Sequence, residues 1–197
     1  MLIRQPTPET IQRFLEKQTQ LDLTYSGVGE TAGTPPPGYT VDHTRVRLGR
    51  GEAVFASACL ALENWQQFDL TWLTAWPAAT PIREESVIAL VARSLGCWWL
   101  NACRIVYVID EGWERKRFGF AYGTLPAHAG SGEERFMVEI DDEGIVWYDI
   151  LAFSLPQGPL SYIGYPYLRH VQKRFARASV EAMQTAVKSS PELAVAT

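Results

Sequence analysis

The sequence has few of the residues that build metal centres or disulfide frameworks, with three cysteines and three histidines in 197 residues. Cys59, Cys97 and Cys103 form no Cys-x-x-Cys pair, and no histidine stands at zinc-ligand spacing from any of them. Scattered cysteines in a chain without a secretory leader predict reduced thiols in a cytoplasmic protein. We therefore expect neither a metal site nor a disulfide.

Long apolar runs are also scarce. The first ten residues, MLIRQPTPET, lack the apolar centre of a secretory signal. The longest apolar region, 86–109, is interrupted by Arg93, Asn101 and Arg104, so no transmembrane helix is predicted. The formal net charge of −4 argues against nucleic acid as a partner.

Local signatures of catalysis and cofactor binding are missing as well. The chain has no Gly-x-Ser-x-Gly and no His-Glu-x-x-His, and the Gly- and Pro-rich segment 24–39 is neither a P-loop nor a dinucleotide fingerprint. The sequence therefore predicts no cofactor, and it favours a binding protein over an enzyme.

Aromatic residues, by contrast, are abundant: seven Trp, eight Tyr and eight Phe. They indicate either a large aromatic core or an aromatic-lined pocket. The order of the expected elements is a helix, an irregular Gly/Pro-rich loop, a strand, a second helix, six strands and a long helix. Their expected ranges are 8–21, 24–39, 39–49, 51–65, 70–76, 86–95, 98–110, 117–125, 133–141, 145–154 and 166–190.

Short connections between six successive strands predict an antiparallel meander. The last helix has an apolar stripe that includes Phe175, so it is the element available to cover one sheet face. The predicted fold class is α+β, a curved antiparallel sheet of about seven strands gripping the long C-terminal helix. We expect residues 1–38 to pack on a main domain of residues 39–190, and the tail 191–197 to fray.

This order of elements resembles the helix-grip fold of the START and birch-pollen-allergen superfamily. Several long blocks also look like the uncharacterised family named "domain of unknown function 1990", over roughly residues 10–187. The blocks are LTYSGVGETAG, PPPGYTVDHTRVRLGRGEAVF, WWLNACRIVYVIDE, RFGFAYGTLPAHAGSGEERF, VWYDILAFS and YPYLRHVQKRFA. The resemblance implies the helix-grip fold and carries no biochemical activity.

Strand 98–110 carries the first candidate ligand-binding residues. Its alternation places Asn101 and Tyr107 on one face and Arg104 in an apolar row on the other. A buried guanidinium needs partners, so Arg104 pairs internally with Asp149 or Glu139 or anchors an anionic ligand, unless it is simply exposed at the strand end. Further candidates for a sheet–helix cavity are Tyr122, His128 and Phe175.

The leading hypothesis is a non-enzymatic binding module for a small apolar or amphipathic ligand, held in that cavity. One alternative is a cyclase- or hydrolase-like enzyme that uses Tyr122, His128 or Glu133 as acid or base. The other is a peripheral membrane or channel-related protein, in which basic residues of the last helix contact an anionic surface. These residues are Arg169, Lys173, Arg174 and Arg177, and the same residues would also suit a simply solvated helix face.

Overall fold

The computed structural model describes residues 1–111 and 116–189, and a seven-stranded antiparallel sheet forms the centre of the fold. The strands lie in the order β1-β7-β6-β5-β4-β3-β2, so β2 to β7 form the predicted meander. Their bounds are β1 (Thr40–Arg50), β2 (Leu73–Trp76), β3 (Val87–Ser94), β4 (Cys97–Asp110), β5 (Arg117–Thr124), β6 (Gly130–Ile140) and β7 (Ile145–Pro156). β1 pairs with the last strand, because the helix that follows it carries the chain to the opposite sheet edge.

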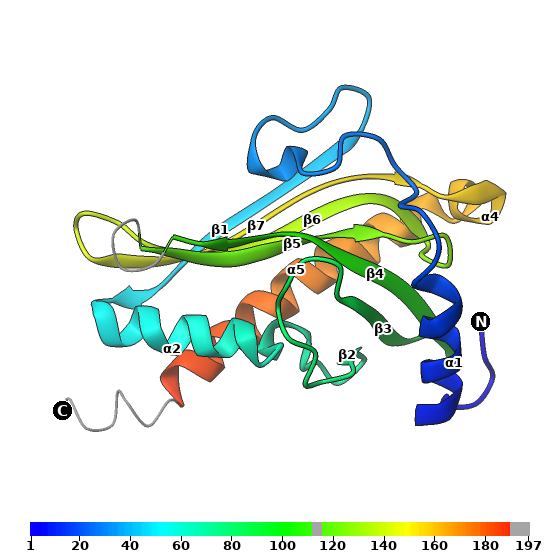
Figure 1. The fold of residues 1–197 in the computed structure, drawn as a ribbon, viewed down its shortest axis with the longest axis horizontal. Coiled ribbons are helices and arrows are strands. Elements are labelled where there is room, and N and C mark those ends of the chain that lie inside the picture. The colour runs from blue at the N-terminus through cyan, green and yellow to red at the C-terminus, as the bar shows by residue number, and fades with distance from the viewer. Residues whose placement is uncertain (112–115, 190–197) are drawn as a thin grey trace.

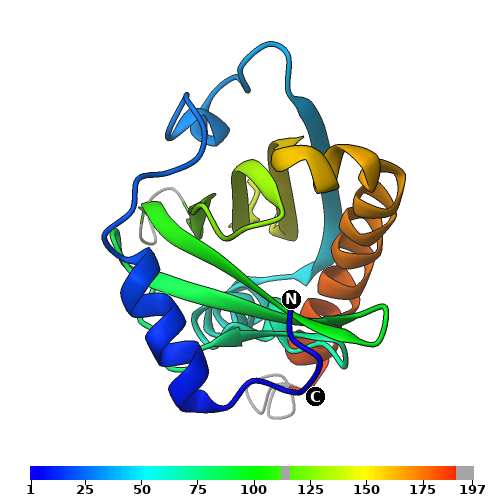
Figure 2. The same ribbon diagram turned by 90° about the vertical axis from the view of Figure 1, so that its right-hand side faces the viewer.

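The helices divide between the two faces and the ends of this sheet. They are α1 (Pro8–Gln18), α2 (Glu52–Glu63), α4 (Gly158–Ile163) and α5 (Tyr165–Lys188), with short 3₁₀ turns η1 (Glu30–Ala32) and η2 (Gln66–Phe68). α2 and α5 lie on one face, while the segment between α1 and β1 crosses the other (Figure 1). Viewed from the side, the sheet curves around α5 (Figure 2). The predicted α+β helix-grip fold is confirmed, and the short helix α4 is an addition to it.

The apolar stripe of α5 explains why this helix is held by the sheet. Its buried residues Phe175, Ser179, Met183 and Val187 recur every four positions, which places them on one side of the helix. The Phe175 ring stacks on Phe68 of η2 with ring centroids 5.3 Å apart. The predicted amphipathic helix is therefore the element that closes the core.

α2 and η2 fill only part of the space beneath the sheet. The buried side chains of α2 join the same core cluster as Met183 and Val187, near the C-terminal end of α5. Among the described residues, no helix as long as α2 lies beside the N-terminal half of α5. This unequal filling leaves a cavity at the other end of the concave face.

A bulge in β4 changes which residues share a face. Ile105 pairs with Tyr122, but Tyr107 pairs with the next residue of β5, Ala121, so one residue of β4 is unpaired. An extra residue reverses the alternation of the residues that follow it. Tyr107 therefore lies on the outer face, where its hydroxyl is 2.7 Å from that of Thr31. The expectation that Asn101 and Tyr107 share a face is wrong for this reason.

The outer face binds the Gly/Pro-rich segment through Glu133. Its carboxylate accepts hydrogen bonds from the Tyr25 hydroxyl at 2.7 Å, the Gly29 amide at 2.7 Å and the Thr31 amide at 3.0 Å. A Cβ on Gly123 would lie 2.3 Å from the Tyr25 hydroxyl oxygen, so this position needs glycine for the close approach. The expected tail 191–197 lies outside the described residues.

Candidate ligand-binding cavity

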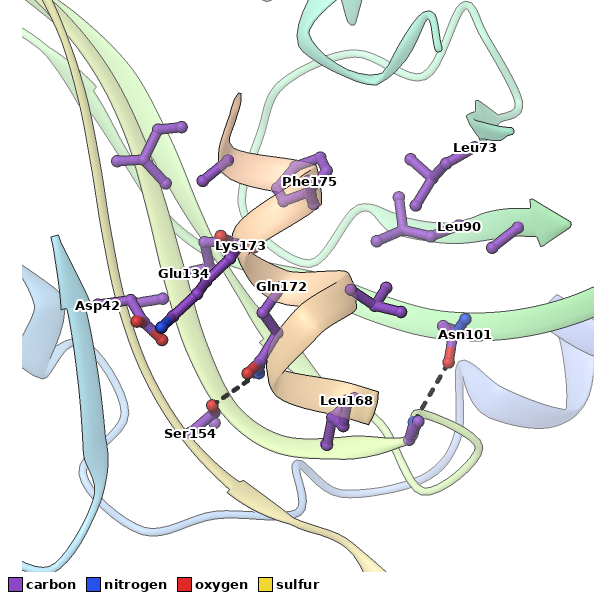
Figure 3. Close-up of a pocket in the computed structure, with 18 of the residues that line it drawn as sticks. Asp42, Leu73, Leu90, Asn101, Glu134, Ser154, Leu168, Gln172, Lys173 and Phe175 are labelled. Atoms are coloured by element: carbon purple, nitrogen blue, oxygen red, sulfur yellow. Dashed lines mark hydrogen bonds between the residues drawn. The ribbon is translucent and has the colours of Figure 1, made fainter. Parts of the chain in front are cut away.

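A cavity of about 990 Å³ lies between the concave face of the sheet and α5. Most of its wall is apolar and comes from distant parts of the chain, including Phe68, Leu73, Leu90, Ile150, Leu168 and Phe175. Figure 3 shows Leu73 and Leu90 on one side of α5 and Asp42 and Glu134 on the other. The volume is within the range of cavities that enclose small molecules.

Glu134 and Tyr122 form a hydrogen-bonded polar pair in this cavity. They stand opposite each other on β6 and β5, and the Tyr122 hydroxyl donates a hydrogen bond of 2.6 Å to Glu134 Oε2. Burial raises the pKa of Glu134 to about 7, the Tyr122 hydrogen bond acts in the opposite direction, and the charge of Asp42 raises it further. Burial also raises the pKa of Tyr122, which stays protonated and acts as the donor.

A second polar group lies where β1 meets α5. Arg169 binds both carboxylate oxygens of Asp42, with an Nη2–Oδ1 distance of 2.6 Å. Arg169 also donates to Gln172 at 2.7 Å, and Gln172 donates to Ser154 of β7 at 3.0 Å. These bonds tie α5 to the edge of the sheet, and they give Asp42 a cationic partner.

The loop between β5 and β6 closes one end of the cavity. The Asn101 side-chain oxygen accepts a hydrogen bond from the Ala129 amide at 3.2 Å, and Ser161 of α4 donates to the Ala129 carbonyl at 2.8 Å (Figure 3 shows the first). His128 accepts a hydrogen bond from the Gly130 amide at 3.0 Å. Burial lowers the pKa of His128 to about 4, so its ring is neutral at pH 7.

The structure brings together four of the six residues that the sequence analysis named for ligand binding. Asn101, Tyr122, His128 and Phe175 line the cavity, and Tyr107 and Arg104 lie on the opposite side of the sheet.

Arg104 has partners other than those expected. It donates to the backbone carbonyls of Thr19 and Leu21 at 2.7 and 2.9 Å, after the end of α1. The expected pairing with Asp149 or Glu139 is wrong, because these carboxylates bind other arginines. Arg135 contacts Asp149 at 2.8 Å, and Arg45 contacts both.

The expected acid or base Glu133 belongs to the cavity lining, but its carboxylate is held in hydrogen bonds with the Gly/Pro-rich segment. The carboxylate that faces the cavity is its neighbour Glu134. Strand alternation contained the signal, since Glu134 shares a face with Phe136 and Val138. From the sequence alone, however, it was not clear whether Glu133 or Glu134 would lie on the face that lines the cavity.

The four basic residues of α5 have different surroundings. Arg169 binds Asp42, while Arg174 lies over the Trp72 ring at 4.3 Å. Lys173 and Arg177 are exposed and contribute to the cavity rim.

The cysteines form no disulfide, and the acidic residues form no metal cluster, in residues 1–111 and 116–189. The three thiols are free, and burial raises the pKa of Cys59 to about 12 and that of Cys103 well above its ordinary value. Within those ranges no three His, Cys, Asp or Glu residues could jointly hold a metal ion. None of the helices described there is long and apolar enough to cross a membrane.

Comparison with known families decides where the chain belongs. The model of the "Domain of unknown function (DUF1990)" matches residues 24–182. The chain belongs to this family. Its relatives include a UPF0548 protein of Arabidopsis thaliana, 34% identical over 94% of this chain and 96% of that protein. A UPF0548 protein of Deinococcus radiodurans is 35% identical over 89% of this chain and 93% of its own length.

Solved structures place this DUF1990 chain in the helix-grip fold. Ara h 8.0201 superposes with a TM-score of 0.54 over 78% of this chain and 100% of that one, at 11% identity. A START superfamily protein of Mycobacterium smegmatis superposes with a TM-score of 0.53 over 77% of this chain and 98% of that one, at 9% identity. The Zhui aromatase/cyclase of Streptomyces sp. R1128 superposes with a TM-score of 0.53 over 76% of this chain and 94% of that one, at 11% identity. At such identities the likeness shows the fold alone.

Proposed function

We propose that this protein is a binding module for a small apolar or amphipathic molecule, held between the sheet and the N-terminal half of α5. The observation that carries the proposal is the cavity of about 990 Å³, with an apolar wall and a few convergent polar side chains. An apolar molecule of matching size would gain dispersion contacts with this wall. The START superfamily neighbour adds fold-level support.

Native mass spectrometry of the purified protein, followed by release of any bound molecule, tests this proposal. Titration with an environment-sensitive apolar dye gives a second measure, with an Ala152→Trp variant that fills the cavity next to Glu134. Ala152 pairs with Glu134 in the sheet and lines the cavity. Val41→Trp on the exposed outer side of β1 is the matched control. Dye binding lost in Ala152→Trp alone supports the cavity; equal binding by all three proteins contradicts it.

A second candidate function is acid–base catalysis on the bound molecule. It is favoured by Glu134, a carboxyl whose pKa of about 7 lets it both give and take a proton near neutral pH. Tyr122 and Glu134 replace the trio of Tyr122, His128 and Glu133 that the sequence suggested. One of the fold neighbours, Zhui, is an aromatase/cyclase. A molecule released from the protein and changed in mass by wild type, but not by Glu134→Gln, would favour catalysis over binding alone.

Contact with an anionic membrane is a proposed route by which an apolar ligand reaches the cavity. Two strongly exposed apolar side chains, Leu95 at 74% and Ile163 at 82%, belong to the cavity rim. The exposed Lys173 and Arg177 belong to the same rim. Apolar side chains beside cations suit the interface of an anionic bilayer.

A further inference from the structure

We propose that the cavity takes an apolar molecule that carries a protonated amine, and that Glu134 binds the amine. This inference rests on the proposed binding function and specifies its ligand class. It reverses the charge expected from the sequence, where Arg104 suggested an anionic ligand. The reversal follows from which charged groups reach the cavity and which of them already have partners.

Glu134 is a carboxyl group with only part of its hydrogen-bonding capacity used. Among the described residues its one hydrogen bond is the Tyr122 contact to Oε2, at 2.6 Å. Oε1 has no such partner there. An ionised carboxylate accepts several hydrogen bonds, so a donor from a bound molecule would complete this group.

The charged groups around Glu134 leave its charge uncompensated. Asp42 of β1 is engaged by Arg169, and His128 of the β5–β6 loop is neutral at pH 7. From α5, Lys173, Arg177 and Glu181 also line the cavity and are exposed to solvent, and Figure 3 shows the Lys173 side chain directed toward Asp42. No ion pair joins Glu134 to a cation within residues 1–111 and 116–189.

An ammonium group suits this environment better than a carboxylate. An anion beside the ionised form of Glu134 would add like-charge repulsion in a poorly solvated space. A cation would form a charge-assisted hydrogen bond with Oε1 and favour the ionised form of Glu134.

The apolar wall fixes where the rest of the molecule would lie. Glu134 and Asp42 are on the β1–β6 side of α5, and Leu73 and Leu90 of β2 and β3 are on the other side (Figure 3). Phe175 lies between these two sides on α5. The amine would therefore bind at Glu134, with the apolar body extending past Phe175 toward Leu90.

Three probes with the same twelve-carbon chain test the inference: dodecylamine, dodecanol and dodecanoate, each below its micelle concentration. The affinity for each probe is measured at pH 8 by its displacement of the apolar dye from wild type, Glu134→Gln and Glu181→Gln. Glu181→Gln removes the same charge from an exposed position on α5 that also lines the cavity. We expect wild type and Glu181→Gln to bind dodecylamine at least tenfold more tightly than either other probe. In Glu134→Gln the affinity for dodecylamine should fall at least tenfold, and the affinity for dodecanol should fall less than twofold.

The inference would be overturned if wild type bound dodecanoate or dodecanol as tightly as dodecylamine, or more tightly. It would also be overturned if Glu134→Gln kept the preference for the amine. A dye that binds but is displaced by none of the probes also overturns it, while the cavity stands. Failure of the dye to bind at all contradicts the proposed function itself. If Glu134→Gln does not fold, wild type alone decides: its amine affinity should fall at least tenfold from pH 8 to pH 5.5, and dodecanol affinity should not change.

Discussion

Tyr122 and Glu134 face each other across β5 and β6, and the phenol donates a 2.6 Å hydrogen bond to the carboxyl inside an apolar cavity. The pair explains how an acidic side chain is kept in this fold without an ion pair among the described residues. Tyr122 supplies one hydrogen bond, and burial favours the protonated form over the charged one.

The raised pKa of Glu134 predicts a specific loss of stability with rising pH. Its pKa is about 7 in the folded protein, against an ordinary value of 4.5. Between pH 4.5 and pH 7 the folded state therefore keeps a proton that the unfolded state has released. Folding stability therefore decreases as pH rises from 4.5 to 7. The decrease from this group is at most about 3 kcal/mol. Urea unfolding at pH 5 and pH 8 measures it.

Glu134→Gln should remove this component of the pH dependence, and Glu181→Gln should keep it. The comparison between variants is needed because His128 acts in the opposite direction. Its pKa is lowered to about 4, so the stability it provides is lost as pH falls from 6.5 toward 4. An unchanged pH dependence in Glu134→Gln would show that this carboxyl titrates normally.

Phe175 is predicted to hold α5 on the sheet. Its ring is 8% exposed, stacks on Phe68 and meets Phe136 edge to face at 6.1 Å. Phe175→Ala should lower the free energy of unfolding by about 3–5 kcal/mol, as for other buried aromatic truncations. Urea melts measure the change, with Arg177→Ala on the exposed side of α5 as the control. A loss below about 1 kcal/mol would mean that the helix does not close the core.

The fold was predictable because periodicity and turn composition carry most of its information. The strand predicted at 98–110 is β4, Cys97–Asp110, and the predicted C-terminal helix is α5. Boundaries were less accurate: the predicted helix 8–21 ends at Gln18, and β6 begins at Gly130 inside the predicted loop 125–132. The short helix α4, Gly158–Ile163, was missed because six residues carry too little periodicity.

The site was less predictable because it depends on faces and partners. Strand alternation put Asn101 and Tyr107 on one face; Asn101 lines the cavity, but a one-residue bulge moved Tyr107 to the outer face. Arg104 was expected to pair with Asp149 or Glu139 or with an anionic ligand, whereas it bonds to backbone carbonyls after α1 and lies near Glu85. No local pattern in the sequence reports a bulge or a carbonyl partner 83 residues away.

Glu133 is predicted to hold the Gly/Pro-rich segment 24–39 on the sheet. Its carboxylate accepts hydrogen bonds from Tyr25, Gly29 and Thr31, so Glu133→Ala would leave these donors without their acceptor. Limited proteolysis with subtilisin should cut within 24–39 at least tenfold faster in this variant than in wild type. Glu143→Ala, at an exposed turn, should match wild type. Rapid cutting throughout this segment in the native protein would contradict its packing.

The exposed apolar rim predicts binding to anionic vesicles. Wild type should float with phosphatidylserine-containing liposomes and much less with phosphatidylcholine alone, because Lys173 and Arg177 add charge attraction. Leu95→Ser with Ile163→Ser should reduce flotation several-fold. The control pair is Val28→Ser with Leu60→Ser, which removes exposed apolar side chains that do not line the cavity. Equal losses from both pairs, or no flotation of wild type, would argue against a membrane route.

Arg104 is predicted to stabilise the protein without taking part in ligand binding. Its guanidinium, 15% exposed, bonds to the Thr19 and Leu21 carbonyls, and Glu85 lies 3.6 Å from its Nε. Arg104→Met removes these bonds and leaves the two carbonyls without their charged donor. We expect a loss of about 1.5–3 kcal/mol in the free energy of unfolding, the usual contribution of hydrogen bonds to charged groups.

The same Arg104→Met protein should bind the apolar dye within twofold of wild type, because Arg104 does not line the cavity. Arg47→Met, an exposed arginine of β1, controls for the loss of one positive charge. Melting curves and dye titrations on the three proteins separate the two properties. A variant as stable as wild type would show that the carbonyl contacts contribute little. A variant that folds normally and loses dye binding would return Arg104 to the ligand site and overturn the assignment of Glu134 as the only charged group that selects the ligand.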